Sequence, residues 1–92
     1  MTSIRFRREA EHDLRAIIAH YQGVAPDILP AITDDIFRSI DLLTDFPAIG
    51  MGVEGRAFRR IVTRRYRFQI AYMSEPGFIT ILGIFRFQDR ER

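Results

Sequence analysis

The sequence contains no cysteine and no lysine, and each absence narrows what the 92-residue chain can do. Without cysteine it can form neither a disulfide nor a thiolate metal site, and its two histidines, His12 and His20, cannot complete a structural zinc site alone. Both histidines lie off the apolar stripe of their helix, and we interpret them as surface residues. Without lysine the chain lacks an amine base, since arginine stays protonated near neutral pH. We expect no metal, no cofactor and a cytoplasmic location.

Long apolar runs are also missing. The N-terminus, MTSIRFRREAEHDL, has no apolar stretch that could serve as a signal peptide, and no segment is long and apolar enough to cross a bilayer. The length and a composition of 47% hydrophobic and 28% charged residues fit one small globular domain. We therefore expect a single domain over residues 1–92.

Arginine, in contrast, is abundant and unevenly placed. All fourteen basic residues are arginine, and six of them fall between Arg56 and Arg67, where there is no acidic residue. The stretch from Asp27 to Asp45 holds five acids and only Arg38. Each guanidinium can hold a phosphate or carboxylate at two points. This asymmetry favours an anionic partner, either nucleic acid or an acidic protein segment; a solvated sheet surface is the alternative.

The spacing of apolar residues in the first half predicts a strand and two helices. Residues 3–7 alternate as in a half-buried strand, and residues 9–21 carry an apolar stripe at helical spacing. We expect a second helix that Asp27 caps, with Pro30 in its first turn and its end near Phe46. The short connection between the two helices predicts an antiparallel helical hairpin.

In the second half the period changes to two. After a loop at 47–55, we predict three strands over residues 58–63, 66–72 and 78–87, the last two joined by a type II turn. The order is strand, helix, helix and three strands, without βαβ alternation. We therefore predict an α+β domain, in which the helical hairpin covers one face of an antiparallel sheet.

Alternation within the middle strand assigns its arginines to one face. Arg65, Arg67 and Gln69 would share the open face, because the intervening residues are aromatic or apolar and would face the helices. These intervening residues are Tyr66, Phe68, Ile70 and Tyr72. A register shift of one residue would exchange the two faces.

Several stretches resemble the RelE/ParE superfamily of toxins from bacterial type II toxin–antitoxin pairs, and its ParE branch in particular. FRREAEHDLRAIIAHY (6–21) is similar to the family's first helix. FRSIDLLTDFPAIGMGVEGRAFRRI (37–61) is similar to its second helix, Pro-x-x-Gly motif and arginine-containing strand. YRFQIAYM (66–73) and FITILGIFR (78–86) resemble its last two strands, with Tyr72 at a frequent tyrosine. The resemblance covers almost the whole chain and implies the same fold.

The resemblance implies one of two activities. ParE-like toxins bind and poison DNA gyrase without catalytic residues, whereas RelE-like toxins cleave messenger RNA on the ribosome. The RelE-like residues include lysines, a histidine or glutamate and often a C-terminal tyrosine. The tail FRFQDRER offers neither tyrosine nor histidine, so only Glu54 or Glu75 remains as a general base. We favour the gyrase inhibitor and keep the ribosome-dependent mRNA endoribonuclease as the alternative.

A neutralising ParD-like antitoxin is also implied by the resemblance. Its C-terminal segment, acidic and amphipathic, would wrap the toxin and form a hetero-oligomer. The candidate residues for contact with antitoxin or target are Arg59, Arg60, Arg65, Arg67 and Arg86. Arg86 occupies a position where many relatives carry a histidine. Direct binding of nucleic acid is a weaker hypothesis, because neither predicted helix combines an apolar stripe with a basic outer face.

Overall fold

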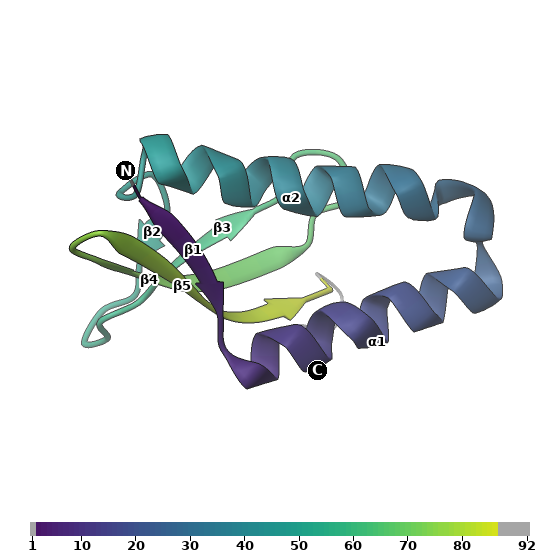
Figure 1. Cartoon of the computed structure of the whole chain (residues 1–92), viewed down its shortest axis with the longest axis horizontal. Helices are drawn as coiled ribbons and strands as arrows, with labels where there is room; N and C mark the ends of the chain where they lie inside the picture. Colours follow the sequence, from purple (N-terminus) through teal and green to yellow (C-terminus); the bar gives the residue numbers. More distant parts are fainter. Residues whose placement is uncertain (1, 87–92) are drawn as a thin grey trace.

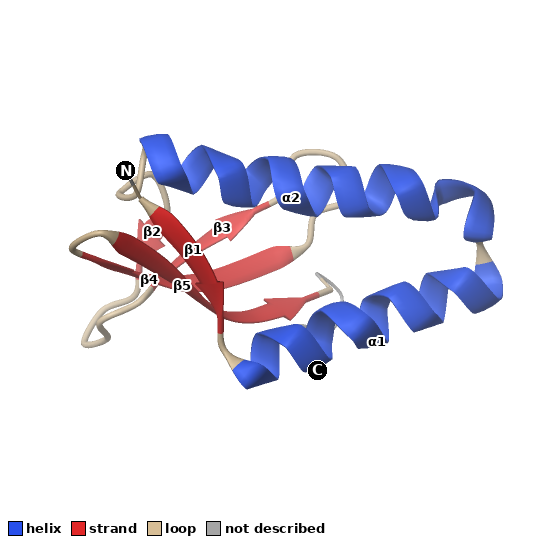
Figure 2. Cartoon of the chain, in the orientation of Figure 1, coloured by secondary structure: helices blue, strands red, loops and turns tan. Residues whose placement is uncertain are grey.

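The computed structural model describes residues 2–86. Two long helices lie over a twisted sheet, and they meet at one end of the molecule through a short connection (Figure 1). The elements are β1 (Ser3–Phe6), α1 (Arg8–Val24), η1 (Pro26–Ile28), α2 (Leu29–Asp45), β2 (Met51–Gly52), β3 (Arg59–Val62), β4 (Gln69–Glu75) and β5 (Phe78–Phe85). The predicted helical hairpin is confirmed, and Figure 2 shows the two helices joined at one end and diverging toward the strands.

The sheet has five strands in the order β1-β5-β4-β3-β2. The neighbours among β2 to β5 are antiparallel, but β1 runs parallel to β5. The α+β class is therefore confirmed, while the sheet is mixed rather than antiparallel throughout. A parallel pair needs a long connection, and here both helices and three strands lie between β1 and β5. The additional strand β2 is a two-residue segment within the predicted loop.

The start of α2 differs from the prediction. Asp27 does not cap the helix: it lies inside the 3-10 turn η1, and Ile28 is the N-cap residue, with no hydrogen bond from a side chain. Pro26 begins that turn, and the Ile28 N–H donates to the Ala25 carbonyl at 3.2 Å. A backbone bond of the 3-10 type thus satisfies the Ile28 N–H within the turn. Within residues 2–86, no helix is sufficiently long and apolar to span a bilayer.

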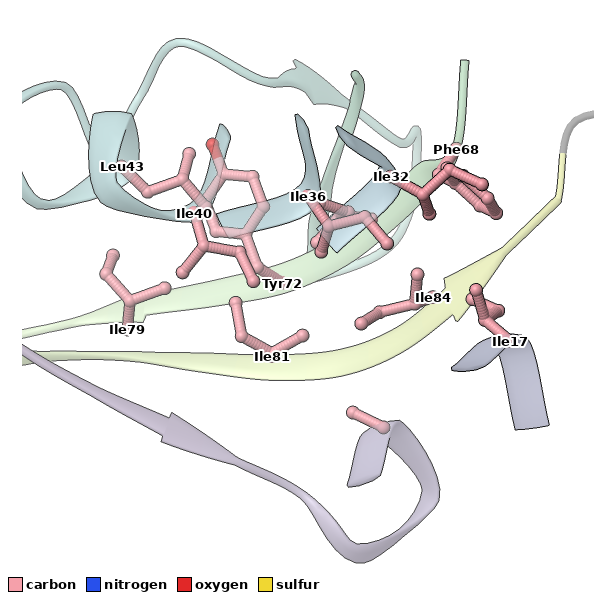
Figure 3. Close-up of a cluster of buried hydrophobic side chains, with 12 residues drawn as sticks. Ile17, Ile32, Ile36, Ile40, Leu43, Phe68, Tyr72, Ile79, Ile81 and Ile84 are labelled. Carbon is pink, nitrogen blue, oxygen red and sulfur yellow. The ribbon is translucent and has the colours of Figure 1, made fainter. Parts of the chain in front are cut away.

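The core lies between the helices and one face of the sheet (Figure 3). As predicted, Phe68, Ile70 and Tyr72 are buried on this side, and Tyr66 packs against the cluster from its edge. Isoleucine is the most frequent residue of the cluster. Its β-branched side chain is favoured in strands. The isoleucines of α2 recur at helical spacing and pack against those strands. The cluster comprises Ala10, Ile17, Ile32, Ile36, Ile40, Leu43, Phe68, Ile70, Tyr72, Ile79, Ile81 and Ile84.

The loop after α2 is attached to this core by Tyr72. The buried hydroxyl donates to the Pro47 carbonyl at 2.7 Å and accepts the Gly50 N–H at 3.0 Å. The Gly50 carbonyl in turn accepts a hydrogen bond of 2.9 Å from the Arg59 guanidinium. Both backbone groups of Gly50 therefore bond to side chains of the sheet, which fixes the loop between α2 and β2.

Candidate protein-interaction groove

The five predicted contact arginines do not form one surface. Arg59 lies opposite Tyr72 in the sheet, on the side that faces the helices, and its guanidinium holds the loop rather than facing solvent. Arg60, the next residue of β3, lies opposite Met51 of β2 and borders the groove described below. Arg65 and Arg67 lie in the turn before β4, and Arg86 follows β5 beside α1. The structure brings only Arg60 and Arg65 together, in the groove described below.

The turn between β3 and β4 explains the largest departure from the sequence prediction. β4 begins at Gln69, not at residue 66. Thr63 closes the turn, because its N–H donates to the Phe68 carbonyl at 2.8 Å and its hydroxyl accepts the Phe68 N–H at 2.9 Å. Arg67 adopts a positive φ of 64°, which ends the strand-like alternation. Residues 63–68 are called the arginine turn below.

The prediction that Arg65, Arg67 and Gln69 share an open strand face is therefore wrong. Two of these residues precede the strand, and Gln69 is only 5% exposed. Gln69 lies between Val62 of β3 and Phe85 of β5 in the sheet register. β4 is a central strand with a neighbour on each side, and Gln69 is buried within the sheet rather than open to solvent.

A buried carboxylate of α2 fixes the arginine turn. Asp35 is 8% exposed, and its two oxygens accept the backbone N–H groups of Arg65 at 3.1 Å and Tyr66 at 2.8 Å. Sequence reasoning treated Asp35 as one more acid of the second helix. The signal that could have found it is its position three residues after Ile32, which places an acid on the buried stripe.

A groove of about 1120 Å³ runs between α2 on one side and β2, β3 and the arginine turn on the other. Apolar side chains line much of it, and several are well exposed, including Leu42, Ile49 and Met51. The apolar lining residues are Ala31, Leu42, Ile49, Met51, Ile61 and Val62. Such a concentration of exposed apolar side chains marks an interaction site more often than plain surface.

Charged residues surround this apolar lining, and their balance is positive. Asp34 pairs with Arg38 at 2.7 Å, and the Asp35 carboxylate is occupied by backbone N–H groups. Arg60, Arg64 and Arg65 also line the groove, and none of the three forms an ion pair within residues 2–86. The groove thus offers an apolar end at Leu42 and Met51 and a cationic end at the arginine turn.

Arg86 belongs to a separate and smaller pocket of about 200 Å³ between α1 and the end of β5. Its guanidinium lies 3.2 Å from Nε2 of His20 on α1. Asp13 completes the polar lining and accepts the Ile84 N–H at 3.0 Å. His12 and His20 are both exposed, as predicted.

Neither of the two glutamates that the sequence offers as a general base lines the groove. Glu54 lies in the loop between β2 and β3, and Glu75 ends β4. Both are exposed, and both lie toward the end of the sheet opposite the arginine turn. Within residues 2–86 no group of three or more histidine, aspartate or glutamate residues could hold a metal ion.

The sequence matches, over residues 4–92, the family described as the ParE toxin of the type II toxin–antitoxin system parDE. The chain belongs to the ParE toxin family. Membership confirms the ParE-like toxin expected from the motifs and implies an antitoxin partner. A solved chain described as the chromosomal ParDE TA system from P. aeruginosa is 27% identical, with a TM-score of 0.79 over 94% of this chain and 96% of that one. No curated protein sequence matches the chain.

For this ParE-family chain, the geometry explains why the Pro-x-x-Gly motif occurs with a later tyrosine. A Cβ atom on Gly50 would lie 2.6 Å from Tyr72 Oη and 2.9 Å from the Arg60 carbonyl oxygen, so only glycine fits. The Pro47 carbonyl accepts a hydrogen bond from the same hydroxyl. Motif and tyrosine therefore form one packed unit, which supports the apolar end of the groove at Ile49 and Met51.

Proposed function

We propose that this ParE-family toxin acts in the cytoplasm by binding and poisoning DNA gyrase, without catalytic residues of its own. The supporting observation is the separation of the arginine turn from the two glutamates that could act as a base. Gln69 and Glu75 are the two ends of β4, roughly 20 Å apart at ~3.4 Å per residue. Glu54 lies toward the same end of the sheet as Glu75. A general base must reach the proton it removes, and neither carboxylate meets that requirement beside the arginine turn.

The cognate ParD-like antitoxin is proposed to neutralise the toxin by placing an amphipathic segment in the groove between α2 and β3. Its apolar residues would cover Leu42, Ile49 and Met51, which are otherwise in contact with water. Its acidic residues would pair with Arg64 and Arg65 at the cationic end. A segment of this composition would bind as other amphipathic helices bind apolar grooves, with its apolar face in the groove and its charged residues at the rim.

The target is tested by incubating the purified toxin, freed of antitoxin, with gyrase and supercoiled plasmid. We expect linear DNA to accumulate after detergent and protease treatment, because a trapped cleavage complex releases broken DNA when the protein is removed. A ribosome-bound messenger RNA runs in parallel and should stay intact. Cut message together with unaffected gyrase would contradict the proposal and support the RelE-like endoribonuclease, with Glu54 or Glu75 as the first residue to replace.

Leu42→Glu should weaken antitoxin binding at least about tenfold, because the substitution buries a carboxylate in an apolar contact. Titration calorimetry with the antitoxin encoded next to the toxin measures the change. Val24→Glu is the matched control: Val24 is an exposed apolar residue at the end of α1 and does not line the groove. Equal affinities of the two variants would place the antitoxin elsewhere on the toxin.

A further inference from the structure

The arginine turn concentrates positive charge on a short loop. Four residues, Arg64 to Arg67, lie between the two ends that Thr63 and Phe68 hold together, and three of the four are arginines. All three arginines are exposed. Arg64 and Arg65 form no ion pair within residues 2–86.

The loop is also built to hold one conformation. Four hydrogen bonds fix it: two between Thr63 and Phe68, and two from the Arg65 and Tyr66 N–H groups to Asp35. The Asp35 carboxylate is therefore directed at the backbone, which leaves the arginine side chains outside. Consecutive N–H groups that converge on an anion form a rigid concavity. The Arg65 guanidinium lies 5.2 Å above the Tyr66 ring, a further restraint on its direction.

The chemistry of the turn's outer surface favours nucleic acid over an acidic protein segment. Thr63 and Phe68 are buried and Tyr66 packs on the core, so the turn itself presents no apolar anchor. Protein–protein binding draws most of its affinity from such anchors. Binding through charge alone is typical of DNA, whose dense phosphates release counterions when arginines neutralise them. A guanidinium can also contact one phosphate at two oxygens.

We propose that the arginine turn binds the phosphate backbone of double-stranded DNA, chiefly through Arg64 and Arg65, without sequence preference. The contact goes beyond the proposed poisoning of gyrase and does not depend on it. Because Arg64 and Arg65 also line the groove, an antitoxin segment in the groove would cover the same guanidinium groups.

The test measures binding of the full-length toxin alone to a short fluorescein-labelled DNA duplex by fluorescence anisotropy, over a series of salt concentrations. We expect steeply salt-dependent binding by the unmodified protein. The double variant Arg64→Ala/Arg65→Ala should bind about tenfold more weakly at low salt, with a slope of log K against log salt smaller by about 1.8, because two phosphate contacts are lost. Circular dichroism shows whether the variant is folded, as expected for exposed side chains.

The control variant Arg8→Ala/Arg15→Ala removes the same two charges from exposed positions of α1 and should bind DNA almost normally. Equal losses in the two double variants would mean that binding follows net charge, and would overturn the proposal. Competition by polyglutamate as effective as that by unlabelled DNA would overturn it in favour of an acidic protein partner. Absence of DNA binding at low salt would also overturn it. Since gyrase is absent from the assay, none of these outcomes depends on whether gyrase is the target.

Discussion

Replacing Gly50 by alanine should lower the free energy of unfolding by about 3 kcal/mol, the upper part of the range for an added methyl group in a filled site. The new Cβ would lie 2.6 Å from Tyr72 Oη, 2.7 Å from Tyr72 Cε1 and 2.9 Å from the Arg60 carbonyl oxygen. Tyr72 is fully buried against the core, and the Arg60 carbonyl belongs to a strand, so neither can move freely. The loop would have to shift, which would weaken the hydrogen bond that Gly50 donates to Tyr72 and the one that it accepts from Arg59.

Urea denaturation followed by circular dichroism measures the effect of this substitution. Gly23→Ala is the matched control, because no atom lies within 4 Å of a Cβ at Gly23 and the residue is part of α1. Alanine is the better helix former, so the control should leave stability unchanged or raise it by up to about 1 kcal/mol. If Gly50→Ala unfolded at the same urea concentration as Gly23→Ala, the close approach of Gly50 to Tyr72 would be relieved by loop movement and would not constrain the fold.

Asp35→Ala should also be damaging, with an expected loss of about 2 kcal/mol, because a donor left unpaired away from water costs ~1–3 kcal/mol and two part-buried donors lose their acceptor. The two donors are the backbone N–H groups of Arg65 and Tyr66, and the aspartate is 8% exposed. The substitution releases the arginine turn from α2. Thermal unfolding measures the loss in stability, and limited proteolysis by trypsin after the turn's arginines should become faster.

The neighbouring acid provides the control. Asp34 forms an exposed pair with Arg38 on the same helix, and Asp34→Ala should cost no more than about 0.5 kcal/mol because solvent and salt screen such pairs. Asp35→Asn keeps one carbonyl oxygen but directs an amide donor at the second N–H, so its stability should fall between those of Asp35→Ala and the unmodified protein. A loss for Asp35→Ala no greater than that for Asp34→Ala would show that water replaces the carboxylate and that the turn does not depend on it.

Much of the fold was predictable because its elements carry their own periodicity. Apolar residues at helical spacing identified both helices, and alternation identified β1, β3 and β5 to within two residues at each end. Boundaries that depend on single hydrogen bonds were less predictable. The sequence ranks Asp27 as a good cap, yet the 3-10 bond from Ile28 to Ala25 forms instead. The parallel pairing of β1 with β5 joins residues more than seventy positions apart in the sequence. No local sequence pattern predicts such a pairing.

The candidate site was predicted only in its chemistry. The arginine-rich stretch favoured an anionic partner, and the groove places three of its arginines beside apolar side chains, while the partner itself stays a prediction. The sequence did not indicate which arginines. Arg59 follows the alternation of its strand, but its guanidinium donates a hydrogen bond to the Gly50 carbonyl. Arg67 lies outside β4. Leu42, Ile49 and Met51 were not identified beforehand, because their proximity depends on how the loop returns to the sheet.

By itself the sequence determined the α+β class, the helical hairpin and the ParE resemblance, because periodicity and motif order are properties of neighbouring residues. The positions of the exposed arginine side chains depend on the tertiary structure. Asp35 lies thirty residues before Arg65, and its carboxylate fixes the backbone of the arginine turn once α2 has packed on the sheet. A bond of this kind forms between segments that folding brings together, so the direction of the arginine side chains is set by packing rather than by the local order of residues.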